Sequence, residues 1–198
     1  AFKRLYDQRW PFQGFADHGV SEALYLADPE GNGIELYADR PRTEWQYLDG
    51  QLQMTTDQLD VEKLLSEASG DSESGNGIDP QTRIGHIHLQ VSDLSKAEDF
   101  YRKLAGFDVT QRNYPGALFV SAGGYHHHLG FNTWNSRGRN MPTEKTLGLV
   151  RYGVDARENR VLEDLKQRLY GAGAIIATTD RAVVARDQDG IQVEFHSS

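Results

Sequence analysis

Residues 28–37 read Asp-Pro-Glu-Gly-Asn-Gly-Ile-Glu-Leu-Tyr, and residues 187–196 read Asp-Gln-Asp-Gly-Ile-Gln-Val-Glu-Phe-His. The two stretches align without a gap, because each begins with Asp, has Gly three positions later and places a Glu between two apolar residues. Each predicts a turn followed by a strand. A match at such long spacing indicates duplicated structural units. Glu35 and Glu194, each on a strand face that should be apolar, need a partner, and a metal ion is one such partner.

Composition narrows the class of protein. The chain has 198 residues, 38% of them hydrophobic and 25% charged, as in one large globular domain or two small ones. A net charge of −8 argues against nucleic-acid binding, and the absence of cysteine excludes disulfides, thiolate nucleophiles and Cys-ligated zinc. The sequence contains no apolar run of about 20 residues and no signal peptide pattern. We therefore expect a cytoplasmic protein that binds neither nucleic acid nor membrane.

The order of predicted elements repeats in the second half of the chain. Residues 83–135 and residues 146–198 each predict a strand, a helix and three further strands, which is a βαβββ module. In the first module the strands are predicted at 83–91, 108–113, 117–122 and 126–133, and the helix at 95–105. In the second they are predicted at 147–154, 175–178, 182–186 and 192–196, and the helix at 159–170. Residues 83–198 are therefore expected to form one domain.

The N-terminal part is expected to be a fragment of a third module. Residues 1–48 predict the end of a helix and two strands, at 23–27 and 33–38, without the opening strand of the module. Residues 49–82 predict a helix and a flexible linker. Within it, residues 69–81 have almost no apolar side chain that could offset the entropy of ordering, so this segment is expected to be mobile.

Two motifs in the first complete module carry a family resemblance. Gly-His-Ile-His-Leu-Gln-Val-Ser-Asp-Leu at 85–94 and Ala-Glu-Asp-Phe-Tyr at 97–101 resemble the vicinal oxygen chelate superfamily, which includes glyoxalase I, extradiol ring-cleaving dioxygenases and bleomycin- and fosfomycin-resistance proteins. The stretches at 20–37 and 124–134 look most like its bacterial catechol 2,3-dioxygenase-like members. The resemblance implies an α+β fold in which paired βαβββ modules form a curved, partly open mixed-sheet barrel.

The resemblance also implies histidine ligands for a metal. It places the first ligand at His86, in the first strand of the complete module. Alternation along a strand puts His126 and His128 on one face and His127 on the other. Aligning the strand with the two repeated Glu positions places His128 at the ligand position, which leaves His126 for acid–base chemistry or a substrate hydrogen bond. A hydrogen-bonded core histidine is the alternative interpretation of His86.

Glu194 is the third candidate ligand. Its two apolar neighbours should pack into the other layer, so Glu194 should face into the cup. Two His and one carboxylate with open positions bind Fe(II) or Mn(II) for oxygen chemistry, and the same set can hold Zn(II) or Ni(II) as a Lewis acid. The alternative interpretation is a strand Glu that pairs with a Lys or Arg.

Two positions depart from the extradiol pattern. Arg151 stands where these enzymes usually have their second His, and a guanidinium cannot ligate a metal. Either His128 replaces that ligand, or Arg151 neutralises Glu194 and the site is empty. Near Val184, where the family has an assisting Tyr, the sequence has none. Tyr152 and Tyr125 are the candidate substitutes, and we assign Tyr152 as catalytic.

The N-terminal fragment offers one more candidate. Asp17, His18 and Glu35 could contribute to a second, related cup, although a His beside Gly and Asp is more often a loop residue. We do not expect this fragment to hold a second metal.

These observations predict a metal-dependent extradiol dioxygenase that acts on a catecholic or related vicinal-oxygen compound and O₂, with a homodimer as its expected assembly. Trp134, Phe119 and Phe131 offer walls for an aromatic substrate, or are ordinary core residues. One alternative is a glyoxalase-like isomerase or thiol transferase. The other is a non-catalytic protein that binds a small molecule, as resistance proteins of the superfamily do.

Overall fold

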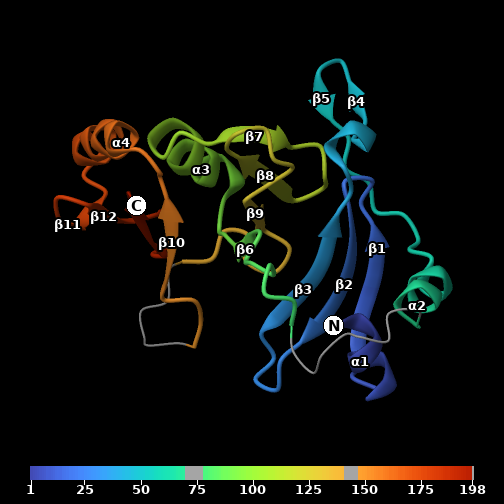
Figure 1. The fold of residues 1–198 in the computed structure, drawn as a ribbon. Coiled ribbons are helices and arrows are strands. Elements are labelled where there is room, and N and C mark those ends of the chain that lie inside the picture. The colour runs from blue at the N-terminus through green and yellow to red at the C-terminus, as the bar shows by residue number, and fades with distance from the viewer. Residues whose placement is uncertain (70–77, 141–146, 198) are drawn as a thin grey trace. The chain divides into compact units, whose positions relative to one another are not determined.

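The computed structural model describes residues 1–69, 78–140 and 147–197, and the chain divides into two units, Ala1–Ile84 and Gly85–Ser198 (Figure 1). We call these unit 1 and unit 2. The predicted mobility of residues 69–81 falls mainly on residues outside the described ranges.

Unit 1 is built on one antiparallel sheet of order β1-β2-β3. Its elements are α1 (Phe2–Asp7), β1 (Phe12–Asp17), β2 (Ser21–Ala27), β3 (Gly33–Asp39), a 3₁₀ turn (Arg42–Glu44), β4 (Tyr47–Leu48), β5 (Gln51–Leu52) and α2 (Val61–Ser69). The turn between β2 and β3 forms as its sequence predicts: Asp28 accepts hydrogen bonds from the backbone N–H groups of Glu30 and Asn32, and Gly31 has φ +87°. Strand β1 was not predicted.

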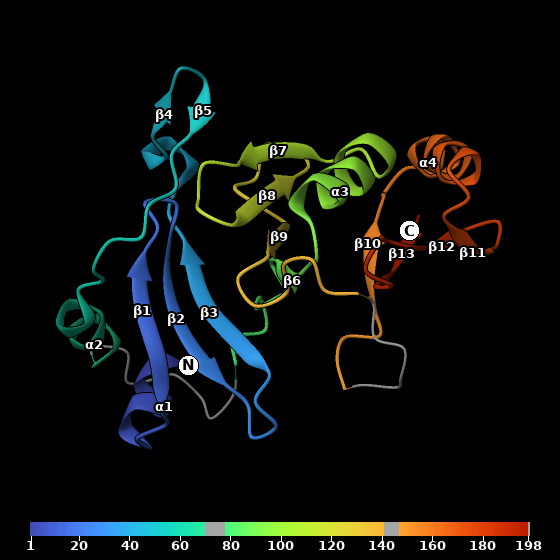
Figure 2. The ribbon, with the colours of Figure 1, turned by 180° about the vertical axis from the view of Figure 1, so that it is seen from behind.

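The two faces of the unit 1 sheet differ in character. Helices α1 and α2 lie beside β1 in both views (Figures 1 and 2), and a small core of Phe2, Leu24 and Leu59 joins sheet and helices. Leu24 pairs with Leu36 in the sheet, so the row of residues next to it points to the opposite face, because successive strand side chains alternate. The members of that neighbouring row, in register across the strands, are Gly14, Tyr25 and Glu35.

Unit 2 contains two βαβββ modules with the same strand order. The first has β6 (Ile87–Gln90), α3 (Leu94–Glu98) continued by a π-helical segment η2 (Asp99–Leu104), β7 (Asp108–Gln111), β8 (Ala117–Ser121) and β9 (Leu129–Asn132), in the order β6-β9-β8-β7. The second has β10 (Arg151–Asp155), α4 (Asn159–Gly171), β11 (Ile175–Thr178), β12 (Ala182–Arg186) and β13 (Gln192–His196), in the order β10-β13-β12-β11. In each module the first and last strands pair in parallel and the others antiparallel.

The two modules of unit 2 share one core. The helix formed by α3 and η2 lies beside α4 in both views (Figures 1 and 2), and Arg168 Nε of α4 donates to the Leu104 carbonyl at 2.8 Å. Buried side chains come from the helices and from both sheets, among them Leu89, Tyr101, Phe131, Leu162 and Phe195. Alternation explains this core, since Val193 and Phe195 point inward while Glu194 between them is half-buried on the other face.

The α+β fold of paired βαβββ modules is therefore confirmed. In the described residues the two four-stranded sheets are separate, so no closed barrel forms. No helix in the described part of the chain is both long and apolar enough to cross a membrane.

Candidate functional site

The predicted strand that contains the three consecutive histidines is shorter than expected. Strand β9 begins at Leu129, so His126, His127 and His128 precede it. The preceding turn explains the difference, because Gly123 and Gly124 both have positive φ, 64° and 68°. The prediction that the strand begins at His126 was therefore wrong.

His86, which immediately precedes β6, packs against the histidine segment. Its ring centroid lies 4.3 Å from that of His127 and 6.5 Å from that of His126. His126 is fully buried, and its Nδ1 is 2.8 Å from Nδ1 of His127, so one of these two nitrogens donates to the other. Of these two rings, that of His127 is thus the closer to His86, although the predicted alternation placed His127 on the face opposite His126 and His128.

His128 occupies different surroundings. Its Nδ1 accepts a hydrogen bond from the Ala122 backbone N–H at 3.2 Å and lies 3.3 Å from the Ser121 hydroxyl oxygen. Its backbone extends the sheet, since its N–H donates to the Val120 carbonyl and its carbonyl accepts from the Ile87 N–H at 3.0 Å. The side chain therefore packs against the end of β8.

Glu194 and Arg151 form an ion pair. Their closest atoms, Arg151 Nη1 and Glu194 Oε2, are 3.2 Å apart, and the side chains are 52% and 34% exposed. The pairing follows from the register, because β10 and β13 run in parallel with Gly153 opposite Glu194. Arg151 therefore neutralises the charge of Glu194 in this structure.

The predicted ligand set is not assembled as a metal site. Among the described residues, no group of three or more His, Asp or Glu side chains is arranged to hold a metal ion. Glu194 pairs with Arg151 and His128 Nδ1 binds a backbone N–H, so His86, His128 and Glu194 as placed do not fit a metal ion. Their assignment as ligands stays a prediction.

Tyr152, the predicted catalytic tyrosine, lies in the core of unit 2. Its hydroxyl donates to the Tyr101 hydroxyl at 3.0 Å, and the Tyr101 hydroxyl donates to Asp187 Oδ2 at 2.9 Å. Burial raises the pKa of both tyrosines, and it also raises the pKa of Asp187 against the lowering effect of the hydrogen bond from Tyr101. This chain of hydroxyls joins β10, η2 and the turn before β13.

A partly exposed group of aromatic rings lies on the first sheet of unit 2. His88, Gly130 and Phe119 are in register across β6, β9 and β8, and the His88 ring covers Gly130, where a Cβ would lie 2.9 Å from its Nδ1. The exposed Trp134 ring lies 5.7 Å from His88. Phe119 and Trp134 thus occupy an accessible face, whereas Phe131 is fully buried and belongs to the core.

A second polar constellation is found in unit 1. His18, in the turn between β1 and β2, has Nδ1 2.6 Å from the Thr55 carbonyl oxygen and Nε2 2.6 Å from the Tyr25 hydroxyl. The Tyr25 hydroxyl also donates to Glu35 Oε1 at 3.1 Å. The side chains of His18, Tyr25 and Glu35 are partly buried and form one continuous chain of contacts.

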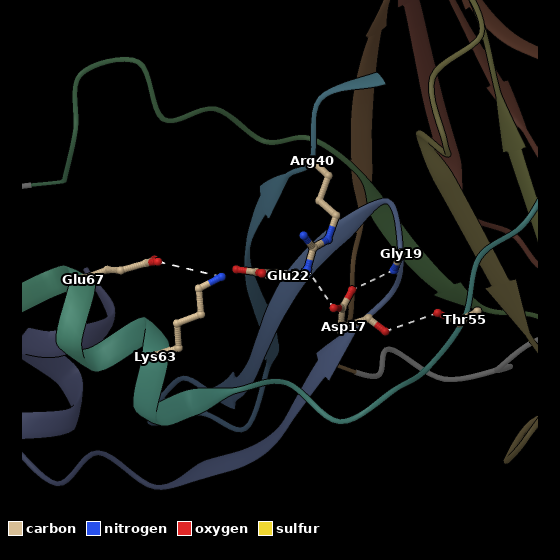
Figure 3. A network of polar contacts seen from close by, with 7 residues as sticks. All are labelled: Asp17, Gly19, Glu22, Arg40, Thr55, Lys63 and Glu67. Atoms are coloured by element: carbon tan, nitrogen blue, oxygen red, sulfur yellow. Dashed lines mark hydrogen bonds and ion pairs between the residues drawn. The ribbon is translucent and has the colours of Figure 1, made fainter. Parts of the chain in front are cut away.

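Ion pairs fix the turn that carries His18 (Figure 3). Asp17 Oδ1 accepts from the Gly19 N–H at 2.9 Å, and Arg40 Nη2 reaches Asp17 Oδ2 at 2.7 Å and Glu22 Oε1 at 2.8 Å. Partial burial acts to raise the pKa of Asp17, but the Gly19 N–H and the Arg40 guanidinium outweigh it and lower that pKa. The side chain of Thr55 is directed to the Asp17 carbonyl in the same view.

Sequence reasoning missed Tyr25 and His127. Tyr25 lies opposite Glu35 in the sheet, ten residues before it in the chain, and Val184 lies opposite Glu194 in the same way. The repeat therefore held the signal. If the alignment of the two stretches is extended ten residues toward the N-terminus from the Glu positions, Tyr25 aligns with Val184, near which the family has its assisting tyrosine. His127 had no such signal, because its contact depends on a bend.

Comparison with a curated protein gives an extended match. Over 179 residues, 88% of this chain, the sequence is 50% identical to a protein of Bacillus subtilis (strain 168) named catechol-2,3-dioxygenase. The aligned region covers 61% of that relative, so the chain spans about three fifths of its length.

Solved structures match at lower identity. The lactoylglutathione lyase of Agrobacterium tumefaciens is 20% identical, with 61% of this chain and 96% of that one covered and a TM-score of 0.47. A glyoxalase/dioxygenase from Nostoc punctiforme is 14% identical, with 64% and 99% covered and a TM-score of 0.49.

The family model matches the two modules of unit 2. It covers residues 83–195, more than half of the chain, and describes the Glyoxalase/Bleomycin resistance protein/Dioxygenase superfamily. The chain belongs to the Glyoxalase/Bleomycin resistance protein/Dioxygenase superfamily.

Proposed function

We propose that the protein is a metal-dependent extradiol-type dioxygenase that cleaves the ring of a catecholic or related vicinal-oxygen compound with O₂. The observation that carries this proposal is the 50% identity over 179 residues to the Bacillus subtilis protein named catechol-2,3-dioxygenase. The superfamily contains several reaction types on one fold, so the fold alone would not have chosen between them.

A divalent metal is part of this proposal, with Fe(II) or Mn(II) first and Zn(II) or Ni(II) next. When bound, such a metal would supply the Lewis-acid and redox chemistry of the reaction. The proposed ligands remain His86, His128 and Glu194, although these side chains as placed do not converge and Glu194 would have to exchange Arg151 for the metal.

The remaining roles belong to the protein's own side chains. His126 is proposed for acid–base work, in which its buried contact with His127 would fix the position of its proton. The exposed Trp134 ring and the neighbouring Phe119 are proposed to contact the aromatic ring of the substrate. Tyr152 was proposed as catalytic; its buried hydroxyl chain to Asp187 supports a role in holding β10, the strand that carries Arg151.

One observation favours a second candidate function, a non-catalytic protein that binds a small aromatic compound. Arg151 occupies a usual ligand position and pairs with Glu194 at 3.2 Å. A cation there opposes metal binding, because it repels a divalent ion and competes for the carboxylate.

One experiment distinguishes the two proposed functions. The protein is loaded in turn with Fe(II), Mn(II), Zn(II) or Ni(II), supplied with catechol and ¹⁸O₂, and its products are examined by mass spectrometry. The dioxygenase proposal expects a ring-opened product that carries two ¹⁸O atoms, formed with Fe(II) or Mn(II). Binding of catechol without ring opening under any metal would instead support the binding protein.

Substitution of Arg151 tests the proposed ligand set. Arg151→His removes the cation that pairs with Glu194 and supplies an imidazole, so metal affinity measured by calorimetry should increase by at least about tenfold. Arg160→His, on the exposed face of α4, is the matched control and should leave the affinity unchanged. Equal affinity in Arg151→His and the unmodified protein would place position 151 outside the metal site.

A further inference from the structure

We propose that four aromatic rings on the first sheet of unit 2 form a binding site for an organic cation of the alkylammonium class. They lie on the face of that sheet that points away from its core, and they come from β6, from β8, from the turn before β8 and from the segment after β9. We call them the aromatic box: His88, Tyr114, Phe119 and Trp134. The site goes beyond the proposed dioxygenase reaction, because the cation takes no part in ring cleavage.

The rings of the box contact one another in a closed cycle. The ring centroids are 5.9 Å apart for His88 and Phe119, and 6.5 Å apart for Phe119 and Tyr114. The cycle closes with 6.3 Å between Tyr114 and Trp134 and 5.7 Å between Trp134 and His88. A square with edges of this length has its centre about 4 Å from each corner, which is inside the roughly 6 Å at which a ring face attracts a cation.

The rings stand as walls and do not stack in parallel. Phe119 makes angles of 86° with His88 and 88° with Tyr114. Trp134 makes angles of 40° with His88 and 58° with Tyr114. A flat aromatic ligand can therefore lie against one wall and meet a second wall only at its edge. A rounded trialkylammonium group can contact all four walls, and the negative faces of the rings attract its charge.

Two glycines allow two of the walls to lie directly on the backbone. The His88 ring covers Gly130, where a Cβ would lie 2.9 Å from its Nδ1, and the Trp134 ring covers Gly116, where a Cβ would lie 3.0 Å from its Cδ1. The indole is fixed further, because its Nε1 donates to the Pro115 carbonyl at 3.0 Å. These two walls are therefore in place before a ligand arrives, which lowers the entropic cost of binding.

Solvent reaches the walls of the box. Trp134 is 55% exposed and Tyr114 is 38% exposed, and His88 is exposed as well, while Phe119 is half-buried. A single exposed apolar side chain is ordinary on a protein surface, whereas apolar side chains that gather in one place indicate a binding site. The closed cycle of four rings is a gathering of the second kind.

The charge of the surroundings suits a cation. The row of the sheet that carries two of the walls contains no lysine or arginine; it consists of His88, Gly130, Phe119 and Gln111. The next residue of the chain, Arg112, pairs with Glu98 at 2.8 Å. The whole chain has a net charge of −8, which attracts cations to its surface.

The test uses choline as the probe and 3,3-dimethylbutan-1-ol as its neutral match, in which a carbon atom replaces the nitrogen. Each compound is titrated into the unmodified protein with a chelator present, at a mildly alkaline pH at which histidine side chains are ordinarily neutral. NMR of the methyl protons measures both affinities. We expect a saturable upfield shift of the choline methyl resonance, caused by the ring currents of the box, and an affinity at least about fivefold higher for choline than for the alcohol. Equal affinities, or a choline resonance that does not shift, would overturn the proposal.

Substitution of Tyr114 tests whether the ring face binds the cation. Tyr114→Leu removes one wall, so the affinity for choline should fall about threefold, whereas Tyr114→Phe keeps the ring face and should bind choline like the unmodified protein. Tyr170→Leu, at the exposed end of α4, is the matched control and should leave the affinity unchanged. Equal affinity in Tyr114→Leu and Tyr170→Leu would show that net charge alone attracts choline, and the box would be refuted.

The choline titration is independent of the proposed reaction. Phe119 and Trp134 are also proposed to contact the substrate ring, so the titration contains neither catechol nor metal. Loss of ring cleavage with intact choline binding would overturn the proposed function and leave the box standing. Ring cleavage by a protein that does not bind choline would overturn the box and leave the proposed function standing.

Discussion

At the scale of single residues, Asp28 and Asp187 show how one repeated position acquires two electrostatic roles. Both cap the turn before a strand, each accepting two backbone N–H groups. Hydrogen bonds from Asn32 lower the pKa of Asp28, whereas burial raises the pKa of Asp187. The same turn chemistry thus serves a solvated loop in unit 1 and part of the core in unit 2.

The opposite shifts predict opposite dependence of stability on pH. The folded pKa of Asp187 is raised above 3.8, so ionisation of Asp187 destabilises the folded state. This loss of stability should begin as pH rises through 3.8 and should level off above the folded pKa. Asp187→Asn should remove that loss in urea unfolding measured over a series of pH values. The folded pKa of Asp28 is lowered, so its contribution is present above 3.8 and disappears as pH falls below it. Asp28→Asn should therefore reduce the loss of unfolding free energy at acid pH. Identical dependence of unfolding free energy on pH in the two variants would show that neither pKa shift is present.

At the scale of elements, the turn into β8 depends on a glycine. Gly116 has φ +72°, and a Cβ there would lie 3.0 Å from Cδ1 of Trp134, whose Nε1 donates to the Pro115 carbonyl at 3.0 Å. The turn and the exposed indole are therefore coupled. Gly123, in the turn that follows β8, has φ +64° but no atom within 4 Å of the position that a Cβ would take. A substitution at Gly123 therefore measures the cost of the backbone conformation alone.

We predict that Gly123→Ala loses about 1 kcal/mol of unfolding free energy, the cost of a left-handed conformation for Ala. Gly116→Ala should lose more and should also change the fluorescence of Trp134, because the added methyl group displaces the ring. Urea unfolding followed by tryptophan fluorescence measures both effects. Equal losses in the two variants with unchanged fluorescence would mean that Trp134 does not rest on this turn.

The local sequence pattern predicted most helices and strands, and it failed where contacts between side chains or between strands decide the structure. Strands β11, β12 and β13 have the bounds that alternation and turn residues predicted, and α4 differs from its prediction by one residue. Strand β9 begins three residues late, because a pair of glycines turns the chain and the histidine rings pack on one another. The contact of Tyr25 with Glu35 depends on the register of two strands, which local pattern does not give.

At the scale of the whole molecule, duplication followed by divergence is the feature that joins fold and proposed chemistry. The two modules of unit 2 share one strand order, and the repeated turn and Glu-bearing strand occur again in unit 1. Glu194 is neutralised by Arg151, whereas Glu35 accepts a hydrogen bond from the Tyr25 hydroxyl. The central claim is therefore that the two repeated carboxylates have separated into a copy that pairs with a cation and a copy that is held by a tyrosine hydroxyl.

Comparison of Glu35→Gln with Glu194→Gln tests this claim most directly. Each variant keeps the size of the side chain and removes its charge at one of the two repeated positions. The measurement is urea unfolding at low and at high salt. The account predicts that the loss of unfolding free energy in Glu194→Gln shrinks when salt is raised, because a partly exposed ion pair is screened, whereas the loss in Glu35→Gln does not. Equal salt dependence in the two variants, or a greater one in Glu35→Gln, would contradict it.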